Sequence, residues 1–174
     1  AREVTGRPSR DPDLGGWLLP LPAIDQQLVV RSAAALAAYG PDVSYSHYAA
    51  IKRLPVLTGA LVGIGTLVGA AQVPPVRRFL ASKVPAGTGP DDATRAGSGF
   101  VVDFVATTGE RKVHTRVSGM DPYDLSGIAL AESALSLLYD DNPATAGQVT
   151  TAQAMGAALT ARLQRCGVLF EVLA

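Results

Sequence analysis

The run Tyr45-Ser46-His47-Tyr48 places an imidazole between two phenols, and it is the part of the sequence best suited to acid–base chemistry. A neutral imidazole beside a phenol can relay a proton or hydrogen-bond a substrate carbonyl. Residues 43–50 alternate as a strand does, so Tyr45 and His47 share one face and Tyr48 lies on the other. We therefore expect Tyr45 to join His47 in a substrate site, with Tyr48 as the candidate on the opposite face. A half-buried histidine satisfied by the backbone is the alternative and the more common arrangement.

Asp121 and Tyr123 form a second candidate group, at the expected start of a helix. The carboxylate of Asp121 can accept hydrogen bonds from the free amides of the first turn, and Pro122 suits the first helical position. This capping role accounts fully for Asp121, and ligand binding is the alternative. Tyr123, in the first turn, could line a substrate cleft or pack against the body of the protein.

Two other reactive side chains carry weaker expectations. His114 alternates with Lys112 and Arg116 on the expected wet face of a strand, so we expect it to be solvated or to face another domain. Cys166 precedes Gly167 at the negative end of an expected helix, which disfavours a thiolate, and we expect no nucleophile there. With two histidines and one cysteine in the chain, we expect no metal site.

Composition restricts the class of protein. The 174 residues include 15 Lys or Arg and 15 Asp or Glu, and this balance excludes nucleic-acid binding driven by bulk charge. A single cysteine excludes a disulfide framework within the chain and fits a reducing compartment, so we expect a cytoplasmic protein. The sequence has no dinucleotide-binding, phosphate-loop, zinc-protease or nucleophile-elbow motif, so we expect no cofactor-binding residues in this chain.

The elements that would position these residues are predicted from hydrophobic periodicity and from glycine and proline signals. Residues 1–23 are rich in Pro, Gly and Asp, and we expect an irregular arm there, followed by a domain over 24–174. The expected helices are 26–39 with Asp25 as its cap, 54–73, one that starts at Asp121, and 150–167. The expected strands are 43–50, 100–106, 112–118 and 168–172, with a loop over 85–99. This order predicts an α+β fold with a mixed or mainly antiparallel sheet of about four strands flanked by helices.

The last two expected helices carry more detailed signals. In the first of them, the helical period predicts an inward apolar stripe of Ile128, Leu135 and Leu138. The second begins at Thr150, and Gln153 three residues later predicts a capping box.

Residues 54–73 carry no charge over twenty residues, about the length needed to cross a bilayer. Glycines dilute the aliphatic residues, and Lys52-Arg53 and Arg77-Arg78 bracket the run, so the positive-inside rule gives no orientation. Three alternatives stay open for this long Gly/Ala-rich apolar helix. It could span a membrane, it could lie on a lipid surface or line an acyl-chain site, or it could pack in the core or in a dimer.

Several strings occur in an order that is similar to a known family. They are 31–36 (RSAAAL), 39–42 (YGPD), 45–48 (YSHY), 74–78 (PPVRR), 117–122 (VSGMDP) and 167–172 (GVLFEV). Over roughly residues 24–173 the chain resembles the C-terminal half of saccharopine dehydrogenase-like oxidoreductases, and within them the bacterial trans-acting enoyl reductases.

The resemblance implies that this chain is a substrate-binding and dimerisation domain. Its implied partners are a Rossmann domain that is absent from this chain and binds NADP or NAD, and a second copy in a homodimer. The implied parent enzyme reduces carbon–carbon double bonds of lipid or polyketide chains, and this chain alone would be inactive. The alternative rests on residues 54–73 alone and is a non-catalytic module that associates with lipid or with a membrane surface.

Overall fold

A computed structural model of the chain describes residues 1–11, 14–21, 23–83, 87 and 89–173. These residues group into two compact units, Ala1–Thr88 and Gly89–Ala174, and both contain helices and strands. The predicted α+β class is confirmed, although the described strands form three small sheets of two or three strands each. That residues 24–174 act as one domain stays a prediction, and each unit is described by itself.

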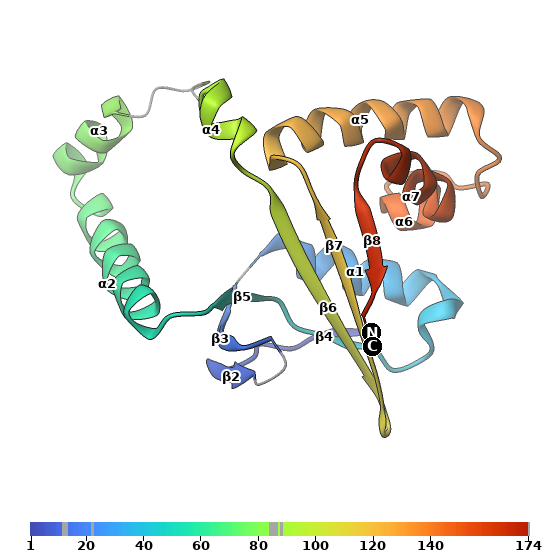
Figure 1. Cartoon of the computed structure of the whole chain (residues 1–174), viewed down its shortest axis with the longest axis horizontal. Helices are drawn as coiled ribbons and strands as arrows, with labels where there is room; N and C mark the ends of the chain where they lie inside the picture. The colour runs from blue at the N-terminus through green and yellow to red at the C-terminus, as the bar shows by residue number, and fades with distance from the viewer. Residues whose placement is uncertain (12–13, 22, 84–86, 88, 174) are drawn as a thin grey trace. The chain divides into compact units, whose positions relative to one another are not determined.

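The first unit contains strands of two to five residues and three helices (Figure 1). Its strands are β1 (Arg2–Glu3), β2 (Ser9–Asp11), β3 (Gly16–Pro20), β4 (Ser44–Tyr45) and β5 (Tyr48–Ile51). Its helices are α1 (Ile24–Ala35), α2 (Leu54–Ala71) and α3 (Pro74–Lys83), with a 3-10 turn η1 (Ala37–Tyr39) after α1.

The segment that we expected to be an irregular arm contains three of these strands. β2, β3 and β5 form an antiparallel sheet in that order, with Leu18 opposite Ala50, and β1 pairs in parallel with β4. The prediction of an irregular arm over 1–23 is therefore wrong. Strands this short show no clear alternation. β1 and β3 are held by hydrogen bonds to residues 44–51, which lie far along the chain, and β2 pairs with β3.

The predicted helix 26–39 forms with different ends. Its N-cap residue is Ala23, which makes no side-chain capping bond, so the prediction of Asp25 as the cap is wrong. Asp25 lies in the first turn, where its charge still faces the positive end of the helix. The α-helix ends at Ala35, earlier than predicted, and Gly40, with a φ of 80°, ends the 3-10 turn that follows.

The predicted strand over 43–50 is interrupted at Ser46 and His47. β4 pairs with β1 whereas β5 pairs with β3, so the chain passes from one sheet to another at these two residues. The Ser46 hydroxyl donates to the Val4 carbonyl, and the His47 carbonyl accepts from the Leu21 amide. Backbone partners from two different sheets therefore fix His47 at the crossing point.

The uncharged run 54–73 is helical, as predicted, and Pro74 starts a second helix after it. In Figure 1, α2 follows β5 and α3 follows α2. Large aliphatic side chains along α2 are exposed, with exposed fractions from 49% at Leu61 to 69% at Val62. The structure therefore gives no support to a place for α2 in the core of this unit. Among the described residues, no helix has both the length and the apolar character that a membrane crossing requires.

The second unit is built on a three-stranded antiparallel sheet (Figure 1). Its strands are β6 (Phe100–Thr108), β7 (Arg111–Gly119) and β8 (Leu169–Val172), with β7 in the middle. The predicted strands 100–106 and 112–118 are confirmed and pair as an antiparallel hairpin, and Gly109 with a φ of 58° sits in its turn. The short helix α4 (Asp92–Ala96) lies in the predicted loop 85–99, so that prediction is wrong over these five residues, while 85, 86 and 88 lie outside the described residues.

The helices of this unit are α5 (Pro122–Tyr139), α6 (Thr151–Ala154) and α7 (Gly156–Arg165). The capping box of Thr150 and Gln153 is confirmed. The predicted helix 150–167 is divided, because Gly156 has a φ of 44° and interrupts the helical backbone. A small apolar core forms around Met155 and Leu159, with Ala154, Val149 and Leu163.

The predicted apolar stripe of α5 is wrong at two of its three positions, although Ile128 is half-buried. Leu135 and Leu138 are 39% and 70% exposed, whereas Ser136 is fully buried. Polar side chains share the inward side of α5 with Ile128, because Glu132 and Asp140, which caps the end of the helix, bind Arg162 of α7. Hydrophobic periodicity predicts that the apolar side of a helix faces the core. Here an arginine from another helix binds acidic residues on the inward side instead.

Arg162 is the centre of this polar contact. Its Nε and Nη2 atoms donate to the two oxygens of Asp140 at 2.6 and 2.8 Å, and Nη1 donates to Glu132 Oε2 at 3.0 Å. These hydrogen bonds lower the pKa of Asp140 from its ordinary value to about 2. Asn142 closes the group by donating from Nδ2 to the Ser136 carbonyl at 2.6 Å. Side chains of α5 and α7 are thus joined by charged hydrogen bonds, which are stronger than neutral ones.

Acid should weaken this contact in a defined pH range. An unfolded aspartate titrates near 3.9. The folded pKa of about 2 is lower, so the stabilisation by Asp140 is complete above about pH 4 and is lost as the pH falls through about 2. We expect Asp140→Asn to unfold more easily at pH 7 and to lose less further stability between pH 4 and pH 2 than the native chain, measured by urea unfolding. The exposed neighbour Asp141→Asn is the control, and a native-like loss in Asp140→Asn over this range would contradict the assignment.

The capping box gives a second prediction. Thr150→Ala removes the side-chain acceptor for the Gln153 amide and should lower the free energy of unfolding by about 1 kcal/mol. Thr150→Ser keeps the acceptor and should lose a small part of that amount. Thr151→Ala, one residue later, is the matched control. Chemical denaturation of the three variants measures the difference, and equal losses for Thr150→Ala and Thr151→Ala would exclude the box as a source of stability.

Candidate functional site

Tyr45 and His47 are in direct contact, as the sequence predicts. The Tyr45 hydroxyl lies 3.1 Å from His47 Nδ1, and the ring centroids are 6.3 Å apart with the rings tilted by 42°. Both side chains are half-buried. A phenol that donates to Nδ1 keeps the imidazole proton on Nε2, so that Nε2 can donate to a substrate oxygen.

Tyr45 stays protonated over a wide pH range. Burial and the negative charge of Asp25 in α1 raise the pKa of its phenol. A phenol of this kind donates a hydrogen bond rather than acting as a base near neutral pH. The pair is therefore suited to hydrogen-bonding a carbonyl and supplying a proton.

Tyr48 does not hydrogen-bond to this pair in the described structure, and its hydroxyl lies against the backbone of Gly6. A methyl group at Gly6 would overlap the Tyr48 hydroxyl and crowd the ring carbons beside it. Gly6 therefore allows the close approach that seats the start of β5. Of the two tyrosines, it is therefore Tyr45 that contacts His47. That these residues form a substrate site stays a prediction.

Asp121 caps α5 and is almost fully buried, with 4% exposed. One carboxylate oxygen accepts from the backbone amides of Tyr123 and Asp124, and the other accepts from the Ser98 hydroxyl at 2.8 Å. Burial opposes the charge, but these hydrogen bonds and the charge of Arg95 hold the pKa of Asp121 below its usual range. The carboxylate is occupied by the protein itself, which supports the capping role, and ligand contact stays a prediction.

Tyr123 lies in the first turn of α5 with 61% of its surface exposed. A methyl group added at Gly89 would come into ordinary van der Waals contact with the Tyr123 ring. The five predicted site residues thus fall into two groups, Tyr45, His47 and Tyr48 in the first unit and Asp121 and Tyr123 in the second. Within each group the structure brings Tyr45 to His47, and it uses the backbone of Tyr123 to hold Asp121.

His114 is part of an ionic cluster that the sequence analysis missed. Its Nε2 atom lies 2.8 Å from Asp103 Oδ1, and Arg116 donates to both oxygens of the same carboxylate, at 2.9 and 3.3 Å. These hydrogen bonds, that from Arg116 above all, lower the pKa of Asp103 although burial opposes them. The expectation of a solvated histidine is wrong, because Asp103 of β6 lies directly opposite Arg116 of β7. The hairpin register was the signal that could have found Asp103, since Arg116 and His114 are two residues apart on one face.

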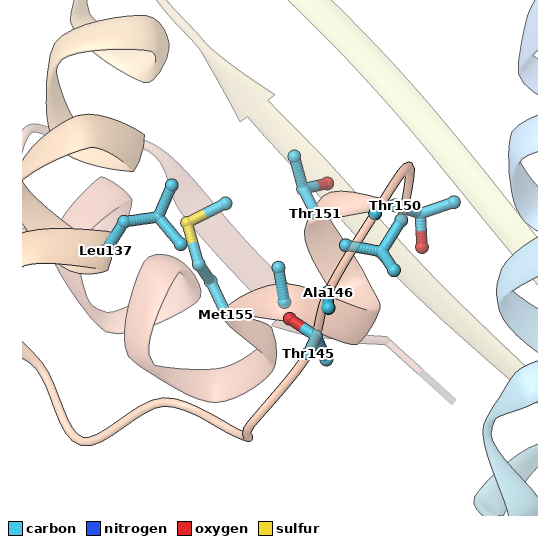
Figure 2. A pocket seen from close by; sticks show the side chains of 9 residues that line it. Leu137, Thr145, Ala146, Thr150, Thr151 and Met155 are labelled. Atoms are coloured by element: carbon cyan, nitrogen blue, oxygen red, sulfur yellow. The ribbon is translucent and has the colours of Figure 1, made fainter.

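A cavity of about 310 Å³ lies in the second unit (Figure 2). Leu137 and Met155 stand at one end of the cavity in Figure 2, and Thr150 and Thr151 stand at the other. The rest of its lining is Thr145, Ala146, Gly147, Val149 and Ala154. The cavity has no ionisable side chain in its lining, so it can hold an apolar group beside threonine hydroxyls but cannot supply an acid or base. No sequence motif marks this cavity, because its walls come from a loop, a helix end and α5.

A second cavity, of about 240 Å³, lies on β7 and β8. It is lined by Thr115, Arg116, Val117, Phe170, Glu171 and Val172. Arg116 and Glu171 are opposite each other in the strand register. Within the described part of the chain, no group of three His, Cys, Asp or Glu side chains is placed to hold a metal ion.

Comparison with known proteins adds a relationship to this geometry. Proteins named trans-acting enoyl reductase from Mycobacterium tuberculosis and Mycobacterium bovis are 32% identical to the chain over 181 residues, which covers 94% of the chain and 43% of each relative. A protein of the same name from Mycobacterium ulcerans is 32% identical over 158 residues, 81% of the chain and 37% of the relative. The chain is similar to trans-acting enoyl reductases.

The similarity to these trans-acting enoyl reductases extends along nearly the whole chain, so it includes both the Tyr45–His47 pair and the second unit. The chain spans less than half the length of the mycobacterial relatives. No family model and no solved structure matches the chain.

The contact of Tyr48 with Gly6 predicts a coupled effect on stability. Gly6→Ala must displace the Tyr48 ring or the start of β5, and we expect a loss of roughly 1 to 3 kcal/mol in the free energy of unfolding. Tyr48→Phe removes the overlapping hydroxyl, so the double variant should lose less than the sum of the single losses. Gly127→Ala is the control, because a methyl group there meets open space and alanine favours a helix. Additive losses in chemical denaturation would show that the two residues do not touch.

Proposed function

We propose that this chain forms the substrate side of an enoyl reductase of the saccharopine dehydrogenase-like type, acting on a carbon–carbon double bond in a lipid or polyketide chain. The observation that carries the proposal is the 32% identity to trans-acting enoyl reductases over 94% of the chain. The proposed whole enzyme is a homodimer in which each chain works with a Rossmann domain. The contact between Tyr45 and His47 gives the proposal its chemistry.

The cofactor of the proposed enzyme is NADP or NAD, and the glycines of α2 do not fit it. A dinucleotide site needs glycines in the turn between a strand and a helix, where free amides face the pyrophosphate. Gly59, Gly63, Gly65 and Gly69 lie within α2, where the backbone amides are committed to helical hydrogen bonds. We therefore assign the dinucleotide to a separate Rossmann domain and derive no step of the reaction from it here.

The part of the reaction that this chain can supply is control of the substrate carbonyl. In an enoyl thioester or enone, negative charge develops on the carbonyl oxygen as the double bond is reduced, and a preorganised donor stabilises that charge. Tyr45 holds His47 in the form that carries its proton on Nε2. His47 Nε2 is then the donor to the oxygen, and Tyr45 is the residue that orients it.

Cofactor binding tests the division of labour. NADPH is titrated into the full chain alone and into the longer protein in which the inferred Rossmann domain precedes it, with binding followed by NADPH fluorescence. We expect no binding to the chain alone and binding to the longer protein. Binding by the chain alone, or a longer protein that binds neither NADPH nor NADH, would overturn the proposal.

The roles of the two side chains are tested in the longer protein with a trans-2-enoyl thioester. We expect His47→Gln to lower kcat by about 100-fold, the lower end for loss of a positioned proton donor, with little change in KM. Tyr45→Phe should shift the pH profile of kcat, because it removes the phenol hydrogen bond to Nδ1, which favours the neutral imidazole. Tyr39→Phe, which changes an exposed phenol outside the pair, is the matched control. Activity of His47→Gln equal to that of the control would remove His47 from the mechanism.

A further inference from the structure

The segment around α2 and α3 differs in charge from the rest of this neutral chain. Between Asp42 and Asp91 the sequence has no Asp or Glu. The same segment has five basic residues, which are Lys52, Arg53, Arg77, Arg78 and Lys83. All five are exposed, and they flank α2 at its start and lie along α3 after its end. Any surface that covers this segment therefore meets positive charge that no carboxylate of the segment itself compensates.

The middle of the segment presents aliphatic side chains to solvent. The exposed fractions are 56% for Val56, 49% for Leu61, 69% for Val62, 59% for Ile64, 54% for Leu67 and 55% for Val68. With 100° between successive residues, all of these except Val62 fall within roughly 140° of the helix circumference. Gly59, Gly63, Gly65 and Gly69 lie on the remaining side with the two threonines. α2 thus has one aliphatic side and one side of small and weakly polar residues.

α3 repeats the combination on a smaller scale. Phe79 is 60% exposed, and the Lys83 ammonium lies 5.3 Å from the centre of its ring. Arg77 and Arg78 are in the same helix. An aromatic side chain beside basic ones is the composition of a helix that lies at the boundary between headgroups and acyl chains.

We propose that α2 and α3 bind the surface of a bilayer that contains anionic lipids. Acyl chains accept the aliphatic side of α2, and lipid phosphates meet the five basic residues. At 1.5 Å per residue, α2 is about 27 Å long, so basic residues at both ends fit a helix lying in the plane of the interface. The binding of such a helix strengthens with the apolar area that it buries and with its electrostatic attraction to anionic lipids.

Charge complementarity favours this occupant over a second copy of the chain. In a symmetric dimer about α2, the same basic residues of both copies would approach one another, with no acidic residue of 43–90 to neutralise them. An anionic bilayer supplies the missing negative charge. The proposal does not depend on the enoyl reductase function, because it rests only on the exposed residues of this segment.

Vesicle binding by the full chain tests the proposal. The chain is sedimented with vesicles of phosphatidylcholine alone and of phosphatidylcholine mixed with phosphatidylglycerol. We expect binding to the anionic vesicles, much weaker binding to the neutral ones, and a loss of binding at about 0.5 M NaCl, where screening shortens the reach of the charges. Failure of this binding leaves the reductase proposal intact, since the two use different readouts.

Two pairs of variants locate the binding surface. Arg77→Gln with Arg78→Gln should weaken binding to anionic vesicles by about 25-fold, at about fivefold for each basic residue removed. Its control is Arg111→Gln with Lys112→Gln, an exposed basic pair in the second unit. Ile64→Asp should weaken binding at least as much, and its control is Leu130→Asp on α5, where Leu130 is 75% exposed. Circular dichroism verifies that each variant is folded.

The outcomes divide clearly. Binding that requires Ile64 and the Arg77–Arg78 pair and that survives both controls supports the proposal. Equal binding to neutral and anionic vesicles, or equal effects of test and control variants, overturns it. A chain that ignores vesicles and forms a dimer that Ile64→Asp dissociates, measured by sedimentation velocity, also overturns it and identifies a second copy as the cover for α2.

Discussion

The second unit depends on the three hydrogen bonds of Arg162. This side chain joins Asp140 and Glu132 of α5 to α7 at distances between 2.6 and 3.0 Å, and it therefore decides which side of α5 faces inward. Once the polar side of α5 is fixed there, Leu137 is brought to the cavity that it shares with Met155. The Cys166 thiol donates to Glu132 at 3.6 Å, and burial with the charge of Glu132 raises its pKa. The expectation of an unreactive cysteine thus has a physical cause in the same contact.

Local signals predicted the elements that depend on local interactions. The glycine and proline stops, the capping box at Thr150, the cap at Asp121 and the hairpin all involve residues within a few positions of one another. The elements that were missed depend on distant partners. β1 and β3 are hydrogen-bonded to residues 44–51. The inward side of α5 is determined by Arg162, which lies 22 residues after Asp140 in the chain.

The candidate site shows the same division. Strand alternation placed Tyr45 beside His47 correctly, although the strand itself breaks between them and changes sheets. It could not find Asp103, whose link to His114 and Arg116 is visible only when the register of the hairpin is known. The large cavity has no motif at all, because apolar walls and threonine hydroxyls have no distinctive spacing in a sequence.

Because residues 43–90 contain no Asp or Glu, the two units of the chain differ in net charge. The first unit holds nine Lys or Arg against five Asp or Glu, and the second holds six against ten. A net charge of zero is therefore the balance of two oppositely charged units. Because the two charges are separated, the chain carries an electric dipole moment. A charged surface would exert a torque on such a molecule, whereas the net attraction would be small because the total charge is zero. The molecule would thus be oriented before contact, with residues 1–88 facing a negative surface. The distance at which this orientation begins would depend on ionic strength, which sets the range of the charges, more than on total charge.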